Sequence, residues 1–475
     1  MKKNALSVAV AASVAAAAAY ADTDGMFVSA ENTGQVILFP YYDAENSNNS
    51  VFHITNTTNE YKAVKIRIME YVNSDEVLDF NLYLSPYDHF SWAMIKDEKG
   101  DGAALKTFDN SCTVPALGSA NPPFSGYTAA DGGLVQPMVN FAYSKDANNS
   151  ITRSLAGHIE VIEMGVVTDT VWQAAIKHTS AGVPKKCSTV QTAMLKNPPA
   201  TADINKVGAP TGGLYGLSYA LNVNDAAAFG IDPFTIDDFS ANSLHSAPGD
   251  ELPSLNDSRA NLKAWQQTPA GAYSDQGYSR TVDAVSGMMM TTGISNDVMV
   301  NSAVGAQSDW VITFPTKRFY VDPDEVGKAA PIAPFNEAYI GKTAKGATDL
   351  ACEDVTLQMW DREEQTTIVD FPGFSPKPPE AQGAEICLEM NVLQMGLESS
   401  LNAELPVSGF AFAFDEGWAR MGFGTGLTLA SSPTYSAKGL PAIGFLATKY
   451  ENSSVADGAF NYGHVAEHKY DIAGS

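Results

Sequence analysis

The feature that most constrains this chain is a series of short segments in which apolar and polar residues alternate. The clearest is "VFHITNTTNEYKAVKIRIMEY", Val51 to Tyr71, where two alternating runs flank the polar turn "NTTNE", and "LDFNLYLS" soon repeats the pattern. A period of two, with β-branched and aromatic residues on one side, is typical of half-buried β-strands. We expect an inward face made of Val64, Ile66, Ile68, Leu78, Phe80, Leu82 and Leu84, and an outward face made of Lys65, Arg67, Asp79, Asn81 and Tyr83.

Similar segments recur along the chain and determine the predicted fold class. They include "GQVILFPYY", "LAGHIEVIEMGVV", "GGLYGLSYALNV", "DWVITFPTKRFYVD", "VTLQMW", "ICLEMNVLQM" and "LPAIGFLATKY". Closely spaced strands with polar turns predict a mainly β protein made of immunoglobulin-like antiparallel β-sandwich domains, with long loops and short helical insertions. We place an N-terminal sandwich domain at residues 22–200 and a C-terminal one, with long inserted loops, at residues 201–475.

Helices and loops are expected between these strands. "TDTVWQAAIKH", with Thr168 or Thr170 as its cap, and "STVQTAMLKN" are predicted to be short helices. Residues 97–150 are rich in Gly, Asn, Ser and Pro, and residues 224–271 lack a sustained period, so both are predicted to be long loops, the second with short helices. Loops of this length often form functional surfaces.

The first residues predict export from the cytoplasm. Two lysines precede an apolar run that ends at Ala19-Tyr20-Ala21, which is the pattern of a secretory signal peptide. We therefore expect residues 1–21 to be removed and the mature chain to begin at Asp22. With no cysteine at that new end and no apolar tail, we expect any attachment to a cell to be non-covalent.

The four cysteines predict two disulfides, because an exported chain matures in an oxidising compartment. Three pairings are possible. We favour Cys112–Cys187 and Cys352–Cys387, which close the shorter loops. Zinc binding is not expected, since no two cysteines have CxxC spacing.

The charge of the chain restricts its partners. It contains 29 basic and 54 acidic residues, for a formal net charge of −25 at pH 7. Nucleic-acid binding, which requires a basic surface, is therefore not expected. A polyanionic partner would need a divalent cation between the two negative surfaces.

Three short motifs suggest catalysis but lack its usual context. His464-Val465-Ala466-Glu467-His468 matches the inverted zincin pattern H-x-x-E-H, but only seven residues follow it and none is a glutamate. Gly216-Leu217-Ser218-Tyr219-Ala220 resembles a nucleophile elbow, yet Ser218 falls within an alternating strand instead of at a strand-to-helix turn. Gly422-Phe423-Gly424-Thr425-Gly426 lacks dinucleotide-binding spacing and is predicted to be a bend or bulge in a sheet. We therefore expect no catalytic residues, no organic cofactor and no enzymatic activity.

Two acidic segments offer the oxygen ligands that calcium prefers. One is "KDEKGDG", with candidate ligands Asp97, Glu98 and Asp101, and the other is "VDPDE", with candidates Asp322, Asp324 and Glu325. The first departs from the EF-hand loop, because Lys99 and Gly100 fall where ligands are required. The scattered histidines are expected to be ordinary surface or core residues. Single tryptophans such as Trp92, Trp310 and Trp360 are expected to lie in sandwich cores and not to form sugar-binding platforms.

The run from "VILFPYYDAENSNNSVFHITNTTNEYKAVKIRIMEY" to "LSPYDHFSW", together with "DWVITFPTKRFYVD", resembles surface-layer (S-layer) proteins of marine gammaproteobacteria. The resemblance covers about Gln35 to Trp92 and recurs near Asp309 to Asp322. It implies a structural protein that self-assembles into a paracrystalline layer on the outer membrane of a Gram-negative cell and contributes to biofilm matrix. Its expected partners are other copies of itself and lipopolysaccharide, reached through divalent cations such as structural calcium.

Two other classes of function stay open at the sequence level. One is a secreted carbohydrate-binding or hydrolytic β-sandwich protein, because two catalytic carboxylates can lie far apart in a chain. The other is an adhesin or filament subunit, which would assemble into fibres instead of sheets.

Overall fold

The computed structural model describes residues 24–120, 125–267, 273–326, 329–339, 350–368, 384–409, 412, 414–424, 427–429, 437–452 and 461–471. The expected signal peptide, residues 1–21, lies outside this part of the chain. The protein is mainly β, with 43% of residues in strands and 11% in helices, as predicted. Within the described residues, no helix has the length and apolar character needed to span a membrane.

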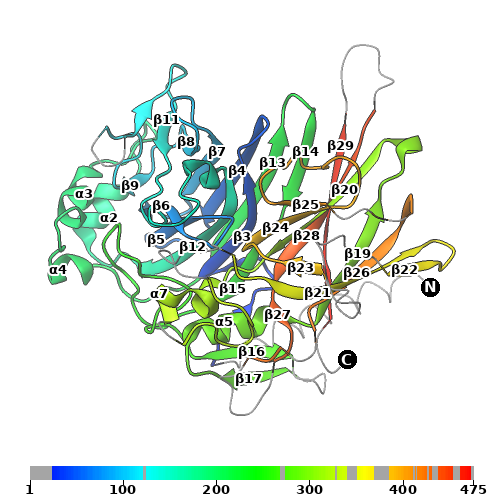
Figure 1. The fold of residues 1–475 in the computed structure, drawn as a ribbon. Helices are drawn as coiled ribbons and strands as arrows, with labels where there is room; N and C mark the ends of the chain where they lie inside the picture. The colour runs from blue at the N-terminus through cyan, green and yellow to red at the C-terminus, as the bar shows by residue number, and fades with distance from the viewer. Residues whose placement is uncertain are drawn as a thin grey trace, which may run out of the picture.

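Two large antiparallel sheets form the N-terminal half (Figure 1). The seven-stranded sheet has the order β1 (Phe27–Val28), β15 (Phe234–Asp237), β3 (Val36–Asp43), β12 (Ala156–Val166), β5 (Lys62–Glu70), β6 (Glu76–Leu84) and β9 (Cys112–Val114). The eight-stranded sheet has the order β10 (Tyr127–Thr128), β11 (Leu134–Pro137), β8 (Ala103–Thr107), β7 (His89–Lys96), β4 (Asn48–Asn56), β13 (Leu214–Asn222) and β14 (Ala227–Ile231), and β2 (Thr33–Gly34) also pairs with β13.

The core between these two sheets follows the alternation seen in the sequence. The predicted inward residues of β5 and β6 are buried, and they cluster with residues of β4 and β7 such as Phe52 and Trp92. Phe52 and Trp92 stack with their ring centroids 5.3 Å apart, as cross-strand partners on β4 and β7. The two sheets therefore share one core, to which these strands contribute every second side chain, and the immunoglobulin-like sandwich stays a prediction.

The C-terminal half contains two more sheets and two short ribbons. The six-stranded sheet has the order β22 (Thr366–Ile368), β21 (Glu353–Asp361), β26 (Glu416–Gly422), β19 (Gly293–Met299) and β30 (Lys469–Tyr470), with β23 (Ala384–Ile386) also paired to β21. The five-stranded sheet has the order β25 (Val407–Gly409), β24 (Met390–Gln394), β20 (Ala306–Thr313), β28 (Ile443–Tyr450) and β29 (Tyr462–Glu467). The ribbons pair β16 (Lys263–Gln267) with β17 (Tyr273–Gly277), and β18 (Met290–Thr291) with β27 (Leu440–Pro441).

The described helices are short and lie between strands. They are η1 (Ile151–Leu155), α2 (Thr170–Ile176), α3 (Ser188–Met194), α4 (Thr201–Ile204), α5 (Thr281–Met289), η2 (Ser302–Val304), α6 (Arg318–Val321) and α7 (Pro323–Val326). The two predicted helices are confirmed as α2 and α3. The cap of α2 was predicted wrongly, however, because the side chain of Asp169 accepts the hydrogen bond from the backbone N–H of Trp172.

The two halves share buried side chains. One apolar cluster contains Tyr41 and Phe229 from the N-terminal sheets together with Val311, Val392 and Phe445 from the five-stranded sheet. Strands β13, β14 and β15 follow the predicted boundary after residue 200, yet they pair with β4 and β3 and complete the N-terminal sheets. The division into two domains, with its boundary at residue 200, stays a prediction.

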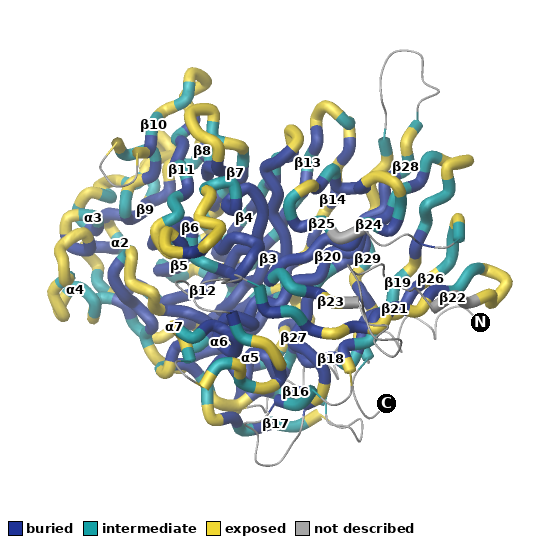
Figure 2. Tube along the Cα trace, viewed as in Figure 1, coloured by how far each residue is buried: buried dark blue, intermediate teal, exposed yellow. Residues whose placement is uncertain are grey.

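The outward face of β5 and β6 is buried, contrary to the prediction. Lys65, Asn81 and Tyr83 have no exposed surface and Arg67 has 1%. The segment Leu244–Asp250, which we call the cover segment, lies over them: Lys65 donates hydrogen bonds to the carbonyls of Ala247 and Asp250. Figure 2 accordingly draws the central strands of this half in dark blue.

The two predicted long loops also contain regular structure. Residues 97–150 include β8, β9, β10 and β11, and residues 224–267 include β14, β15 and β16 without a helix. Their strands are only two to five residues long, so the turn residues around them obscured the period in the sequence.

Both favoured disulfides, Cys112–Cys187 and Cys352–Cys387, are confirmed. The first joins β9 at the edge of the seven-stranded sheet to the start of α3. Two disulfides indicate an oxidising environment outside the cytoplasm.

Candidate functional site

The candidate site is a cleft of about 550 Å³ in the N-terminal half, which we call the acidic cleft. It lies between the turn before β6, the loop around Phe141, the end of the cover segment, and helices α6 and α7. Seven carboxylates and two arginines line it: Asp75, Glu76, Asp79, Glu251, Asp322, Asp324 and Glu325, with Arg67 and Arg318. The excess of carboxylates makes the cleft suited to a cation.

Helices α6 and α7 position the three predicted ligands of this cleft. Asp322 ends α6, and its carboxylate accepts the backbone N–H of Asp324 at 2.8 Å. Pro323 then begins α7, with Asp324 and Glu325 in its first turn, where acidic side chains are favoured. Asp322 is nearly buried, whereas Asp324 and Glu325 are exposed at the cleft.

Ion pairs balance part of the negative charge. Glu76 lies 2.7 Å from Nε of Arg67, and Glu325 lies 3.1 Å from Nη2 of Arg318. Burial raises the pKa of Glu76, and the Arg67 guanidinium opposes this shift. Asp79, in the wall of the cleft, lies 2.5 Å from Nζ of the buried Lys65.

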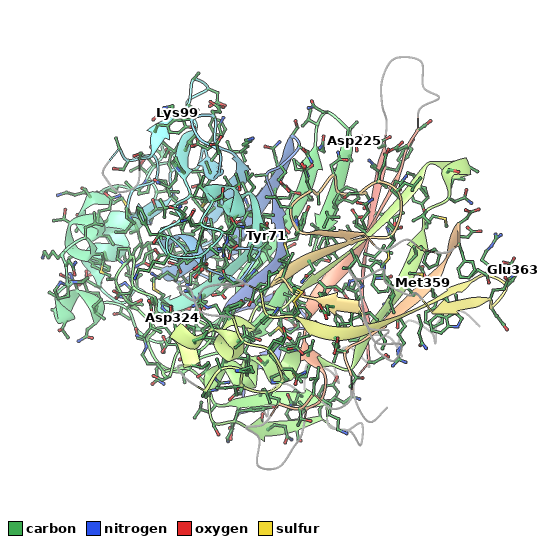
Figure 3. The ribbon with its side chains drawn as sticks, viewed as in Figure 1. Tyr71, Lys99, Asp225, Asp324, Met359 and Glu363 are labelled. Carbon is green, nitrogen blue, oxygen red and sulfur yellow. A yellow bond between two sulfur atoms is a disulfide. The ribbon has the colours of Figure 1, made fainter. Side chains whose placement is uncertain are left out.

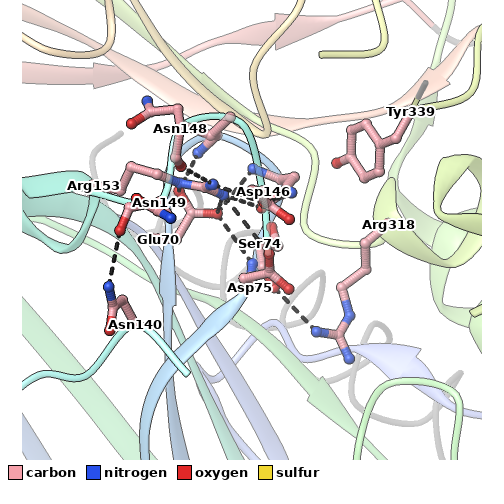
Figure 4. Close-up of polar contacts among 12 residues, drawn as sticks. Glu70, Ser74, Asp75, Asn140, Asp146, Asn148, Asn149, Arg153, Arg318 and Tyr339 are labelled. Carbon is pink, nitrogen blue, oxygen red and sulfur yellow. Dashed lines mark hydrogen bonds and ion pairs between the residues drawn. The ribbon is translucent and has the colours of Figure 1, made fainter. Parts of the chain in front are cut away.

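A buried network behind the cleft holds its turn in place (Figure 4). Nε and Nη2 of Arg153 donate to the two oxygens of Glu70 at 3.1 and 2.8 Å, and Nη1 donates to Asp146 at 2.9 Å. The Glu70 carboxylate also accepts the backbone N–H groups of Val72, Asn73 and Asp75. Because these three amides belong to the turn before β6, the network fixes the backbone that carries Asp75 and Glu76.

Ser74, which precedes Asp75 in this turn, links the two halves of the molecule. Ser74 donates to Glu389 at 2.9 Å, and Tyr339 donates to the other oxygen of Glu389 at 2.7 Å. Burial raises the pKa of Glu389 to about 7 and lowers the pKa of Lys317 to about 8. The turn that carries two carboxylates of the cleft therefore also contacts the C-terminal half.

The carboxylates of the cleft do not form a complete chelating set. In the described part of the chain, the one group of three His, Cys, Asp or Glu residues whose ligand atoms lie within 4.8 Å of each other is Cys352, Glu385 and Cys387. Its two sulfur atoms form a disulfide and are not available as ligands. A cation in the acidic cleft would therefore need ligands from water or from a partner.

The other predicted ligands, Asp97, Glu98 and Asp101, lie in the turn between β7 and β8, far from the cleft. Figure 3 shows Lys99 of this turn and Asp324 of the cleft in separate regions. Asp97 accepts hydrogen bonds from the Tyr127 hydroxyl at 2.7 Å and from the backbone N–H of Lys99 at 3.1 Å. Lys99 also lies over the Tyr127 ring, so a cation would compete with this lysine.

Sequence reasoning missed four carboxylates of the cleft, namely Asp75, Glu76, Asp79 and Glu251. The segment "NSDEVLD" is as acidic as "VDPDE" and precedes a strand, which could have marked it. That the two segments lie together depends on contacts between residues distant in the sequence.

The catalytic motifs take non-catalytic positions. His464 and Glu467 lie in strand β29, where the helix required by H-x-x-E-H is not formed, and His468 is buried with its Nε2 3.0 Å from the Val311 carbonyl. Burial lowers the pKa of His468 to about 4. Ser218 is in strand β13 as predicted, but its hydroxyl is buried and donates to the Ile231 carbonyl.

The outer side of the eight-stranded sheet, which we call the open face, is a second candidate. Alternate residues of β13, β4 and β7 point to it and are partly exposed, while the residues between them are buried. None of these side chains belongs to a buried core cluster or packs against one. Its residues are Tyr215, Leu217, Tyr219, Leu221, Asn49, Val51, His53, Thr55, His89, Ser91, Ala93 and Ile95.

Two histidines stack at the centre of the open face. Nδ1 of His53 lies 3.2 Å from Nε2 of His89, and Nδ1 of His89 lies 2.8 Å from the Thr55 hydroxyl. Burial, and to a smaller extent the neighbouring His89, lower the pKa of His53. The open face therefore becomes positively charged when His53 is protonated at low pH.

Two tryptophans of the six-stranded sheet are also exposed. Trp360 of β21 and Trp418 of β26 are cross-strand partners, and their rings stack with centroids 4.1 Å apart. Trp418 is 41% exposed and Trp360 is partly exposed, so the expectation of a core position fails for Trp360. Trp92 and Trp310 are buried, as predicted.

Comparisons of this chain with family models, curated proteins and solved structures find no match.

Proposed function

We propose that this protein is an exported structural protein of the cell surface that assembles with copies of itself into a layer on the outer membrane and in biofilm matrix. The observation that carries the proposal is the open face, a broad sheet surface with tyrosine, leucine, valine and isoleucine side chains. The immunoglobulin-like sandwich remains the expected module of the layer. The absence of enzymatic activity is part of the same proposal.

The charge of the open face favours a second copy as its occupant. The chain has a formal net charge of −25, so two copies repel each other over most of their surfaces. None of the twelve residues of the open face is acidic. Copies can therefore approach there with the least repulsion and the largest gain from apolar burial.

The acidic cleft would provide attachment to the membrane. Its carboxylates are partly neutralised and do not complete a coordination shell, which leaves positions for phosphate oxygens of lipopolysaccharide around a bridging calcium ion. A bridging site differs from a purely structural one in this respect, because the partner must supply some of the ligands.

The first experiment tests self-assembly through the open face. Leu217→Lys places a charge in the middle of it, and Leu397→Lys is the matched control, because Leu397 is 96% exposed in the other half. In sedimentation velocity and electron microscopy with calcium, the unmodified protein and Leu397→Lys should form sheets, and Leu217→Lys should stay monomeric. Monomers of the unmodified protein at high concentration, or normal sheets of Leu217→Lys, would reject the proposal.

The second experiment tests attachment through the cleft. The paired change Asp324→Asn and Glu325→Gln should weaken calcium-dependent binding to lipopolysaccharide vesicles, measured by co-sedimentation. The matched control is Asp97→Asn with Glu98→Gln, which removes the same charges in the β7–β8 turn. Equal loss in both variants would show that total charge, and not the cleft, determines attachment.

The stacked Trp360 and Trp418 favour a second candidate function, binding of a polysaccharide. Exposed aromatic pairs on a sheet offer flat apolar surfaces with neighbouring polar groups, here Arg420 and Gln358. Trp360→Ala should then reduce retention on insoluble polysaccharides without changing assembly. Equal retention of both proteins would remove this candidate.

A further inference from the structure

The two stacked histidines of the open face, His53 and His89, each place one ring nitrogen at the same point of the sheet surface. β4 and β7 are antiparallel neighbours, with His53 opposite Ser91 and Thr55 opposite His89. His53 and His89 are therefore diagonal neighbours on one face, a spacing that aromatic side chains can bridge. Both rings are accessible from outside, because His89 is exposed and His53 is partly exposed.

The separation of the two nitrogens is close to that of two ligands on one metal ion. Nδ1 of His53 and Nε2 of His89 are 3.2 Å apart. Two histidine nitrogens bound to one zinc ion at about 2.0–2.1 Å lie about 3.4 Å apart when the angle between them is tetrahedral. Without a metal ion, one of these nitrogens carries a proton and donates a hydrogen bond to the other. A metal ion would take the place of this proton.

Two neighbouring side chains hold the rings in position. Nδ1 of His89 lies 2.8 Å from the Thr55 hydroxyl, and the tautomer in which Nδ1 donates to this hydroxyl leaves Nε2 free to bind a metal ion. Metal-binding histidines usually donate their other ring N–H to an oxygen in this way. The Tyr219 ring packs edge-on against His53, with ring centroids 6.0 Å apart. The histidine pair is therefore positioned before an ion binds.

The chemistry of the histidine pair determines which ions it can bind. Imidazole nitrogen suits zinc, copper and nickel, whereas calcium prefers oxygen ligands. None of the twelve residues of the open face is acidic, so they offer calcium no carboxylate. The open face and the acidic cleft should therefore bind different ions.

We propose that His53 and His89 form a binding site for a divalent transition-metal ion such as zinc, through Nδ1 of His53 and Nε2 of His89. Water occupies the remaining two of the four positions that are usual for zinc. The binding does not rest on the proposed assembly, since both ligands come from one chain. The two histidines are 36 residues apart in the sequence, so no spacing motif marked them.

The test measures zinc binding to the full chain by titration calorimetry, with excess calcium to occupy carboxylate sites and at concentrations below assembly. Loss of a group that only orients a ligand costs about 10–100-fold in metal affinity, so His53→Gln and His89→Gln should each weaken zinc binding at least about 10-fold. His464→Gln is the matched control and should bind zinc like the unmodified protein. It removes an exposed imidazole from strand β29, where His468 is buried.

Thr55→Val tests how His89 is positioned. Valine keeps the shape of threonine but accepts no hydrogen bond, so zinc affinity should fall about 10-fold. Electron paramagnetic resonance of the copper-loaded chain gives a readout that a merely structural role would not change. It should show two coordinated nitrogens in the unmodified protein and one in His89→Gln.

Three results would overturn the proposal: no zinc binding at millimolar concentration, unchanged affinity in both histidine variants, or an equal loss of affinity in His464→Gln. Circular dichroism would show whether each variant is folded. If His53→Gln does not fold, His89→Gln carries the test, because His89 is exposed. None of these results depends on sheet formation, which is measured without zinc.

Discussion

Two sheet faces of the N-terminal half lie in environments opposite to those that their side chains suggest. The outer face of β5 and β6 carries Lys65, Arg67 and Asn81, yet it is buried beneath the cover segment. The open face of β13 and β4 carries Tyr215, Leu217 and Tyr219, yet it is partly exposed. The difference shows that the type of side chain does not decide alone which face of a sheet is covered.

The physical reason lies in whether the polar and charged groups of each face have hydrogen-bond and ion-pair partners. On the covered face, cross-strand charges pair, as Arg67 does with Glu160 at 3.0 Å, and polar groups bond to backbone carbonyls of the cover segment. Removing one partner from such a face leaves the other buried charge uncompensated. The open face has few charges to satisfy, so it can lie against water or against another copy.

The largest expected effect comes from removing one member of a covered ion pair. Arg67→Met leaves Glu160 buried without its counter-charge and should lower the free energy of unfolding by about 3–5 kcal/mol, measured by urea denaturation. Arg67→Met with Glu160→Leu should recover much of this loss. Arg420→Met is the control, because Arg420 pairs with Asp471 at the exposed surface and should change stability by less than about 1 kcal/mol.

A smaller loss of stability is expected when the disulfide at the edge of the seven-stranded sheet is removed. Replacing Cys112 and Cys187 by serine removes the link between β9 and α3 and should lower stability by about 2–4 kcal/mol. Assembly through the open face should persist at temperatures where the variant is still folded. Loss of assembly in the folded variant would show that the two faces are coupled.

A third prediction compares one histidine from each region as the pH falls. His245 of the cover segment receives the Tyr83 hydroxyl bond at Nε2, and burial lowers its pKa to about 4. The unfolded chain binds a proton near pH 6.5 and the folded chain does not, so this histidine should cost about 2 kcal/mol of stability between pH 8 and pH 5. His245→Gln should flatten that dependence in urea titrations at the two pH values.

The control for this prediction is His53→Gln on the open face. The pKa of His53 is also lowered, so the sign is the same, but the residue is partly exposed and the effect on stability should be smaller. Its main effect should be on assembly, which acidification weakens in the unmodified protein. An equal stability change in both variants would contradict the distinction between the two faces.

The smallest effect on stability is expected on the open face itself. Leu217→Lys should change the free energy of unfolding by no more than about 0.5 kcal/mol, because the side chain contacts no buried cluster. Thermal unfolding followed by circular dichroism would measure this. A large destabilisation would mean that the open face is part of the core of the isolated chain.

Much of the local structure was predictable from the residues. The inward residues of β5 and β6, helices α2 and α3 and both disulfides follow from period, composition and spacing. Of the candidate site, the acidic segment at Asp322 to Glu325 was recognised, but the four carboxylates opposite it were not. Each segment was visible by itself, whereas their proximity required contacts across some 240 residues, such as Arg318 with Ser74.

The sequence alone determined that the chain is mainly β, strongly acidic and crosslinked by two disulfides, because alternation, charge and cysteine spacing are local properties. The tertiary structure alone decided that Leu244–Asp250 covers the charged side of β5 and β6, and that Tyr215, Leu217 and Tyr219 remain outside. The reason is that a strand presents two faces of fixed composition, but the segment that reaches either face comes from a distant part of the chain.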